Sequence, residues 1–217
     1  MKLRVNEVFR SLQGEGGLTG TPAVFIRLQG CDVGCPWCDT AYASGLDAEN
    51  RLADNDLTVF RKTEGSPAHT YADGSWLVRE IAARTPPGRL AVITGGEPCL
   101  QDAGGLADAL LTAGFAVQME TSGTRPIDCP ARVWVTLSPK ARPVVEANWA
   151  RADEIKLPVH GMEDILRHEA RLTALPPEKI RLQPVSQGER ATGLCIRLCQ
   201  ERNWRLSVQM HKYLRLR

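Results

Sequence analysis

The chain has 217 residues, of which 43% are hydrophobic, and its formal net charge is +2 at pH 7. That length and apolar content suit one sizeable domain, and the near-neutral charge gives no strong attraction to nucleic acid or a membrane surface. No stretch approaches the roughly 20 apolar residues of a membrane-spanning helix, and residues 1–7 lack the apolar part of a signal peptide. The composition therefore predicts a cytoplasmic protein, in a reducing compartment where thiolates remain available for metal.

Strand-like and helix-like segments alternate along most of the chain. Strands are expected over residues 2–9, 23–29, 90–93, 115–119, 132–137, 154–158, 180–183 and 205–209. Helices are expected over residues 76–84, 103–113 and 188–202. Such alternation favours parallel pairing through right-handed crossovers. The predicted fold is α/β, an open or partial (truncated) β/α barrel, with residues 1–217 in a single domain.

Residues 41–75 form the least regular part of the chain. Glycine, proline and asparagine interrupt any periodic pattern there. We expect an irregular insertion of loops or short elements that lies beside residues 30–40 and shapes access to them.

Chemically distinctive motifs follow the predicted strands. Residues 30–40 follow strand 23–29, residues 94–98 (TGGEP) follow strand 90–93, and residues 120–123 (ETSG) follow strand 115–119. Residues 138–140 (SPK), 183–186 (QPVS) and His211 stand at or after the ends of later strands. Ligands of α/β folds bind at the carboxyl ends of the strands. The shared position of these motifs predicts one site built from all of them.

Residues 30–40 carry Cys31, Cys35 and Cys38 in a C-x3-C-x2-C spacing. A zinc site would need a further ligand pair, and Cys99 is single and distant. A disulfide framework is disfavoured by the odd total of seven cysteines; chemically inert cysteines remain the third alternative. Three thiolates can hold a 4Fe–4S cluster and leave one iron open, whereas clusters that only carry electrons usually have four cysteines. The motif resembles that of the radical S-adenosylmethionine enzymes, and an aromatic residue, Trp37, precedes its last cysteine.

Other residues at the strand ends suit S-adenosylmethionine, each with a plainer alternative. Gly96 permits close backbone approach and Glu97 could accept from the methionine ammonium, or the run is an ordinary turn with a surface acid. Trp37 could stack on adenine or act as a hydrophobic anchor. Ser138 and Lys140 offer a hydroxyl and a cation at a strand end, or form a turn around Pro139. Gln183-Pro184 is equally ambiguous.

Thr40, beside Asp39, could hold a hard cation or cap a helix. The loop with Gln13 and Glu15 could read an amide-like heterocycle edge and lacks the ending of a phosphate loop. Arg27 is a lone cation in an apolar strand, so it needs either a substrate carboxylate or a structural acid.

The remaining cysteines and histidines are given structural roles. Cys99, Cys129, Cys195 and Cys199 are predicted to be core residues. His69, His160 and His168 are expected at the surface or in loops, and His211 alone would by default be structural.

The chain as a whole resembles the 7-carboxy-7-deazaguanine synthase family, radical S-adenosylmethionine enzymes of queuosine and 7-deazapurine biosynthesis. The resemblance rests on residues 12–16 (LQGEG), Arg27, residues 38–40 (CDT), 94–98, 120–121, 138–140 and 183–184, and residues 209–214 (QMHKYL). It implies a Mg²⁺-dependent lyase that contracts the ring of 6-carboxy-5,6,7,8-tetrahydropterin to 7-carboxy-7-deazaguanine and releases ammonia. It also implies a truncated β/α barrel of the radical S-adenosylmethionine type, usually a homodimer.

The resemblance also assigns site residues by position. Cys31, Cys35 and Cys38 would hold the 4Fe–4S cluster and Thr40 would bind Mg²⁺. The pterin would contact Leu12, Gln13, Gly14, Glu15, Arg27, Thr94, Glu120, His211 and the terminal Arg217. S-adenosylmethionine would contact Trp37, Asp39, Gly96, Glu97, Ser138, Pro139, Lys140, Gln183, Pro184 and Ser186. No residue is assigned as a catalytic acid or base.

Two other functions compete with this interpretation. A radical activase acting on a partner protein shares the cysteine spacing but would not need Arg27, the Gln13–Glu15 loop or the His211 ending. A non-catalytic iron–sulfur protein would need a fourth ligand and no Gly-Gly-Glu turn. The expected partners are the small pterin, a flavodoxin- or ferredoxin-like reductant and a second copy of the chain, with no nucleic acid or membrane.

Overall fold

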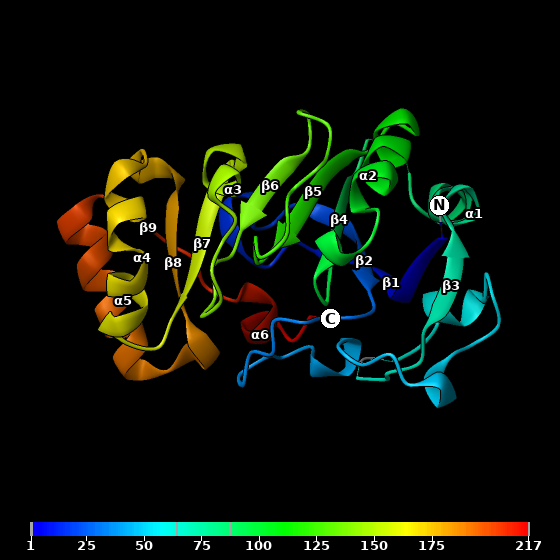
Figure 1. The fold of residues 1–217 in the computed structure, drawn as a ribbon, viewed down its shortest axis with the longest axis horizontal. Helices are drawn as coiled ribbons and strands as arrows, with labels where there is room; N and C mark the ends of the chain where they lie inside the picture. Colours follow the sequence, from blue (N-terminus) through cyan, green and yellow to red (C-terminus); the bar gives the residue numbers. More distant parts are fainter. Residues whose placement is uncertain (1, 64, 87, 217) are drawn as a thin grey trace.

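A computed structural model describes residues 2–63, 65–86 and 88–216. These residues contain one nine-stranded sheet, ordered β3-β1-β2-β4-β5-β6-β7-β8-β9, which does not close (Figure 1). Its strands are β1 (Lys2–Leu12), β2 (Pro22–Leu28), β3 (Thr70–Asp73), β4 (Leu90–Gly95), β5 (Ala116–Thr121), β6 (Trp134–Leu137), β7 (Glu154–Val159), β8 (Ile180–Pro184) and β9 (Arg205–Leu206). The predicted partial barrel is confirmed.

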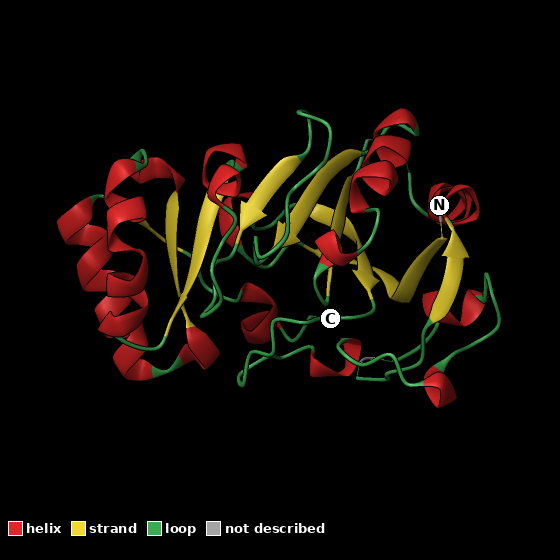
Figure 2. Ribbon diagram, in the orientation of Figure 1, coloured by secondary structure: helices red, strands yellow, loops and turns green. Residues whose placement is uncertain are grey.

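Longer helices connect the strands and pack against them (Figure 2). They are α1 (Gly74–Arg84), α2 (Ala103–Thr112), α3 (Glu146–Arg151), α4 (Met162–Ala174) and α5 (Glu189–Arg202). The short α6 (Met210–Leu214) lies apart from them, near the middle of the molecule (Figure 1). No helix among the described residues combines the length and apolar character needed to cross a bilayer.

The strands pair in parallel only from β2 onward. β1 pairs antiparallel with both β2 and β3, so the expectation of parallel pairing throughout is wrong at this edge. The reason is the connection between β1 and β2, residues 13–21, which is too short for a crossover and places Leu12 opposite Pro22. The loop of residues 13–21 therefore lies at the amino end of β2. The other motifs gather at the opposite edge of the sheet, where the parallel strands have their carboxyl ends.

The strands from β5 to β8 carry two different faces. Apolar side chains such as Met119, Val135, Leu157 and Leu182 belong to the main core cluster. Polar side chains occupy alternate positions, and all but the half-buried Glu120 are buried: Gln118, Glu120, Thr136, Ser138, Glu154, Lys156, Arg181 and Gln183. Because neighbours along a strand point to opposite faces, the polar set shares one face of the sheet. This face lines the interior of the open barrel.

The irregular insertion is built of short elements, as predicted. It contains the 3₁₀ helices η2 (Ala41–Ala43), η3 (Ala48–Asn50) and η4 (Leu57–Phe60), and it ends in β3 at the sheet edge. His69 was expected at the surface or in a loop. It lies outside the named strands but not at the surface: it is 1% exposed, and its N–H donates to the carbonyl of Asn50 at 2.9 Å. The ladder that β3 forms with β1 draws this segment inward.

The sequence also failed to predict α3 and α4. In α4 only Ile165 and Leu172 are buried, so the apolar pattern is sparse. Its start is stabilised by Asp164, whose carboxylate accepts from the N–H of His160 at 2.8 Å. The predicted strand 205–209 is wrong beyond Leu206, because Gln209 turns inward and α6 begins at the next residue.

Candidate functional site

Two adjoining cavities open on the polar face of the sheet. The first, here the cysteine cavity, is lined by Cys31, Cys35 and Cys38. The second, the arginine cavity, is lined by Arg27 and His211. Residues that line both are Glu15, Asp39, Thr40, Thr94, Gly95, Glu120 and Lys212. The motifs predicted to form one site therefore gather around one connected space.

Backbone groups of the irregular insertion, residues 41–75, form hydrogen bonds with the start of the cysteine loop. The N–H groups of Gly30 and Cys31 donate to the carbonyls of Ala43 and Ser44 at 2.7 and 3.1 Å. The amide of Gln29, a buried side chain, donates to the carbonyl of Gly45 at 2.6 Å. Backbone bonds of this kind fix the loop that carries the thiols.

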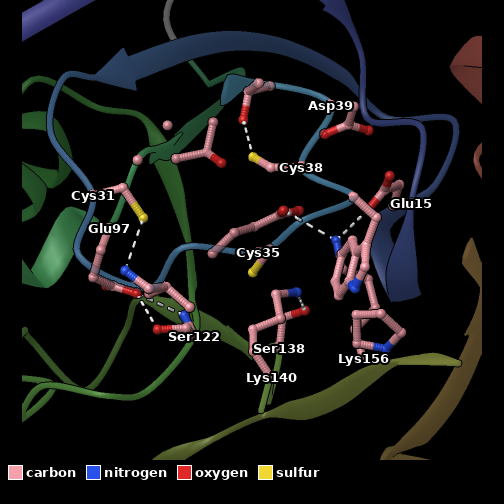
Figure 3. Close-up of a pocket in the computed structure, with 18 of the residues that line it drawn as sticks. Glu15, Cys31, Cys35, Cys38, Asp39, Glu97, Ser122, Ser138, Lys140 and Lys156 are labelled. Atoms are coloured by element: carbon pink, nitrogen blue, oxygen red, sulfur yellow. Dashed lines mark hydrogen bonds and ion pairs between the residues drawn. The ribbon is translucent and has the colours of Figure 1, made fainter. Parts of the chain in front are cut away.

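The three cysteine sulfurs face a common space (Figure 3). The described residues contain no group of three or more His, Cys, Asp or Glu side chains placed to hold one metal ion. A single ion holds its ligands about 2.3 Å away, so they crowd together, whereas a 4Fe–4S cube binds each thiolate at a different corner. Three thiols around one open space supply the donors that three corners of such a cube need. Burial raises the pKa of Cys31 and Cys35, so metal binding there must displace protons.

Glu97 is 1% exposed and is held by several donors. Its carboxylate accepts from the hydroxyls of Thr121 and Ser122, each at 2.5 Å, and from the N–H groups of Cys99 and Ser122 at 3.0 and 2.9 Å. The surface-acid alternative is therefore wrong. These bonds orient the carboxylate where it borders the cysteine cavity.

Gly96 lies against the start of the cysteine loop. A Cβ atom at this position would lie 2.1 Å from the carbonyl oxygen of Gly30 and 3.1 Å from the Cβ of Cys31. The turn after β4 and the cysteine loop approach so closely that only glycine fits.

Replacing Gly96 by alanine is therefore expected to displace the cysteine loop and sharply reduce iron incorporation. Iron and sulfide analysis after anaerobic reconstitution measures this, together with the melting temperature. Gly193→Ala is the matched control, because a Cβ there meets no atom within 4 Å and alanine is favoured in a helix by about 1 kcal/mol. Normal iron content in Gly96→Ala would contradict the close approach.

Trp37, Ser138 and Lys140 come together on one side of the cysteine cavity. The Lys140 ammonium donates to the hydroxyl of Ser138 at 2.6 Å and lies 5.2 Å from the centre of the Trp37 ring. Burial lowers the pKa of Lys140, and Lys156 adds to this. Gln183 and Ser186 line the same cavity, while Pro139 and Pro184 are buried beside it and are not among its lining residues.

Arg27 already has an acidic partner. Its Nε donates to Oε1 of Glu7 at 2.7 Å, and the hydroxyl of Tyr42 donates to the same oxygen at 2.9 Å. Glu7 is fully buried, and the Arg27 side chain is 13% exposed. Of the two partners considered for Arg27, the structural acid is therefore present, and the exposed part of the guanidinium borders the arginine cavity.

The loop between β1 and β2 enters the barrel from the amino ends of the strands. Gly17 N–H donates to Glu154 Oε2 at 2.7 Å, at the first residue of β7. Gln13 Nε2 donates to Gln118 Oε1 at 2.7 Å and to Glu120 Oε1 at 3.0 Å. The loop thus closes the floor of the site and brings Gln13 and Glu15 up to the motifs at the opposite edge.

Gly14 and the start of α6 fix each other. The carbonyl of Gly14 accepts from Met210 N–H at 2.9 Å, and a Cβ on Gly14 would lie 2.6 Å from Nδ1 of His211. His211, Leu12 and Thr94 border the arginine cavity. Arg217 lies outside the described residues.

Asp39 and Thr40 stand where the two cavities meet. The Asp39 carboxylate accepts from Gln209 Nε2 at 3.3 Å and lies 3.4 Å from the Lys212 ammonium. Thr40 precedes η2, but its side chain makes no capping hydrogen bond there. Its hydroxyl lies 3.6 Å from the Cys38 sulfur and borders both cavities.

Several residues of the site were missed from the sequence. Chief among them is Lys156, whose ammonium contacts Glu15 and Glu120. A signal was available: Glu154 and Lys156 stand two apart in an otherwise apolar strand, and Gln118 and Glu120 have the same spacing in β5. Glu7 and Tyr42, which hold Arg27, were missed as well. Ser122, Gln209 and Lys212 lie inside motifs that the sequence singled out, but they were given no role of their own.

Two curated proteins and one solved structure resemble the chain over nearly its whole length. A scan against protein-family models gave no match. The chain is 44% identical to 7-carboxy-7-deazaguanine synthase of Escherichia coli (strain K12), over the full length of both, and 40% identical to that of Buchnera aphidicola subsp. Schizaphis graminum (strain Sg), over 98% of each. It superposes on the crystal structure of QueE from Escherichia coli with a TM-score of 0.88 and 43% identity, covering 97% of this chain and 95% of that one. These relatives set aside the activase and the non-catalytic alternatives, and the chain belongs to the 7-carboxy-7-deazaguanine synthase family.

Proposed function

We propose that the chain converts 6-carboxy-5,6,7,8-tetrahydropterin to 7-carboxy-7-deazaguanine with release of ammonia, by Mg²⁺-dependent radical chemistry. The observation that carries this is the junction of the two cavities. A space lined by three cysteines opens directly into one lined by an arginine and paired carboxylates. A cofactor in the first and a carboxylated heterocycle in the second would lie side by side.

The cysteine cavity would hold the cluster on Cys31, Cys35 and Cys38. A reduced 4Fe–4S cluster with S-adenosylmethionine supplies the radical that begins the reaction. Glu97 supports this assignment because its carboxylate, fixed by four hydrogen bonds, suits a methionine ammonium. Lys140 and Ser138 offer donors, and the Trp37 ring an apolar surface, for the rest of the cofactor.

The arginine cavity would hold the pterin. The exposed part of the Arg27 guanidinium suits the substrate carboxylate, while Nε remains with Glu7. Glu15, Glu120 and Gln13, whose amide donates to Glu120, would accept hydrogen bonds from N–H groups of the ring. Leu12, Gly14, Thr94, His211 and the terminal Arg217 complete the assigned set.

Thr40 is assigned to Mg²⁺. Its hydroxyl borders both cavities and does not cap η2. A hard cation with one protein ligand takes its other oxygens from water and substrate, and the pterin carboxylate is the natural source here. The partners proposed are a second copy of the chain and a flavodoxin- or ferredoxin-like reductant.

The test is anaerobic turnover by the reconstituted protein with the pterin, S-adenosylmethionine, Mg²⁺ and a reductant, with products read by mass spectrometry. Formation of 7-carboxy-7-deazaguanine is expected, and chelation of Mg²⁺ is expected to slow it at least about tenfold. Thr40→Ala should reproduce that loss, and Thr40→Ser, which keeps the hydroxyl, should largely avoid it. Release of 5′-deoxyadenosine without the deazaguanine would refute the substrate and leave the radical chemistry standing.

A further inference from the structure

Lys156 is a buried cation set between two carboxylates from different parts of the chain. It is 3% exposed, in the middle of β7. Its ammonium contacts Oε2 of Glu15, from the loop at the barrel floor (Figure 3). It also lies 3.0 Å from Oε2 of Glu120, near the end of β5. One lysine thus joins elements far apart in sequence.

The second oxygen of each carboxylate is bound by neutral amides. Glu15 Oε1 accepts from Gln209 at 2.9 Å, and Glu120 Oε1 accepts from Gln13 at 3.0 Å. Lys156 is therefore the charged partner that both carboxylates share. Lys156 lowers the pKa of Glu15 to about 2, against the opposing effect of burial, and the two carboxylates raise the pKa of Lys156.

Without that cation no charged group would hold the two carboxylates together. Two carboxylates that border the same cavity repel each other, and a cation between them offsets this repulsion. The ammonium of Lys156 therefore helps to fix where Glu15 and Glu120 present their acceptor oxygens.

Lys156 also lies on a particular side of the pair. Glu15 and Glu120 line both cavities, whereas Lys156 is among the lining residues of the cysteine cavity and not of the arginine cavity. Lys156 therefore contacts the two carboxylates from the cysteine cavity, and the carboxylates remain accessible from the arginine cavity.

We propose that Lys156 is a positioning residue for the pterin: its ammonium holds the carboxylates of Glu15 and Glu120 at a fixed separation, so that both accept hydrogen bonds from N–H groups of the ring. This inference rests on the proposed function. It assigns Lys156 to recognition of the substrate and not to binding of S-adenosylmethionine, although its ammonium borders the cofactor's cavity.

The experiment compares binding and turnover in Lys156→Met with the reconstituted, unsubstituted enzyme. Calorimetric titration of the enzyme loaded with S-adenosylmethionine, without reductant, gives the Kd of the pterin. We expect that Kd, and the KM, to rise about 30-fold, because truncating one partner of a buried charge pair leaves the other uncompensated. The Kd of S-adenosylmethionine and the iron content are expected to change less than about twofold, since Lys156 is not assigned to either.

Further variants separate positioning from general stability. Lys156→Gln keeps one donor without the charge and should match the methionine variant, while Lys156→Arg keeps the charge and should recover part of the affinity. Lys156→Gln also serves if Lys156→Met does not fold. Lys179→Met is the matched control, because its ammonium contacts the carbonyl of Ala152 outside both cavities, and its pterin Kd should equal that of the unsubstituted enzyme.

The outcomes discriminate between the two proposals. An unchanged pterin Kd in Lys156→Met and Lys156→Gln, or equal weakening of pterin and S-adenosylmethionine, would overturn the role of Lys156 alone. If the unsubstituted enzyme neither binds nor converts the pterin, the proposed function fails and this inference fails with it.

Discussion

Alanine in place of Cys35 is expected to abolish formation of 7-carboxy-7-deazaguanine and to prevent stable assembly of the cluster. Cys35 lies between Cys31 and Cys38 in a loop whose start is fixed by the Gly30 and Cys31 backbone bonds to the insertion. Because these bonds persist in the variant, the loop should keep its course while the cube loses one of three thiolates. The variant should therefore lose iron and sulfide while its fold remains intact.

The measurement is iron and sulfide content together with the visible absorption of the reconstituted protein, followed by turnover. Cys199→Ala is the matched control, because Cys199 is a half-buried free cysteine on α5 and lines neither cavity. It should retain cluster and activity. A Cys35→Ala protein with full iron content and turnover would refute the assignment of the three cysteines.

The sequence predicted well those features that a local pattern determines. The apolar run of β4 marks a buried parallel strand, and the motif after each parallel strand falls at the same edge because parallel strands end together. By this reasoning the cysteine loop, Glu97 and Ser138 belong to one site, and all of them line the cysteine cavity.

Features that depend on pairing over long distances were not predictable in the same way. Whether β1 runs parallel or antiparallel to β2 decides from which side Gln13 and Glu15 enter the barrel, and no local pattern states it. The role of Lys156 depends on its contacts with Glu15 and Glu120, which come from distant parts of the chain. For Arg27 the sequence left two possible partners open, a substrate carboxylate or a structural acid, and the structure shows Glu7 beside it.

Methionine in place of Arg27 is expected to have two separable effects. Glu7 is fully buried and would lose the guanidinium partner 2.7 Å away, which should lower the free energy of unfolding by about 3 kcal/mol. The pterin would lose the cation assigned to its carboxylate, which should raise its Kd about 100-fold. Both changes are measured on the reconstituted protein, by denaturant titration and by calorimetric titration of the pterin.

The double variant Glu7→Gln/Arg27→Met separates the two roles of the arginine. Removing the buried acid together with the guanidinium should restore most of the stability, because the charge that Arg27 neutralised is then gone, while the pterin Kd stays high. Arg171→Met removes an exposed ion pair with Glu146 and should change neither quantity. If the double variant binds the pterin as tightly as the unsubstituted protein, Arg27 serves Glu7 alone and the substrate carboxylate must be bound elsewhere.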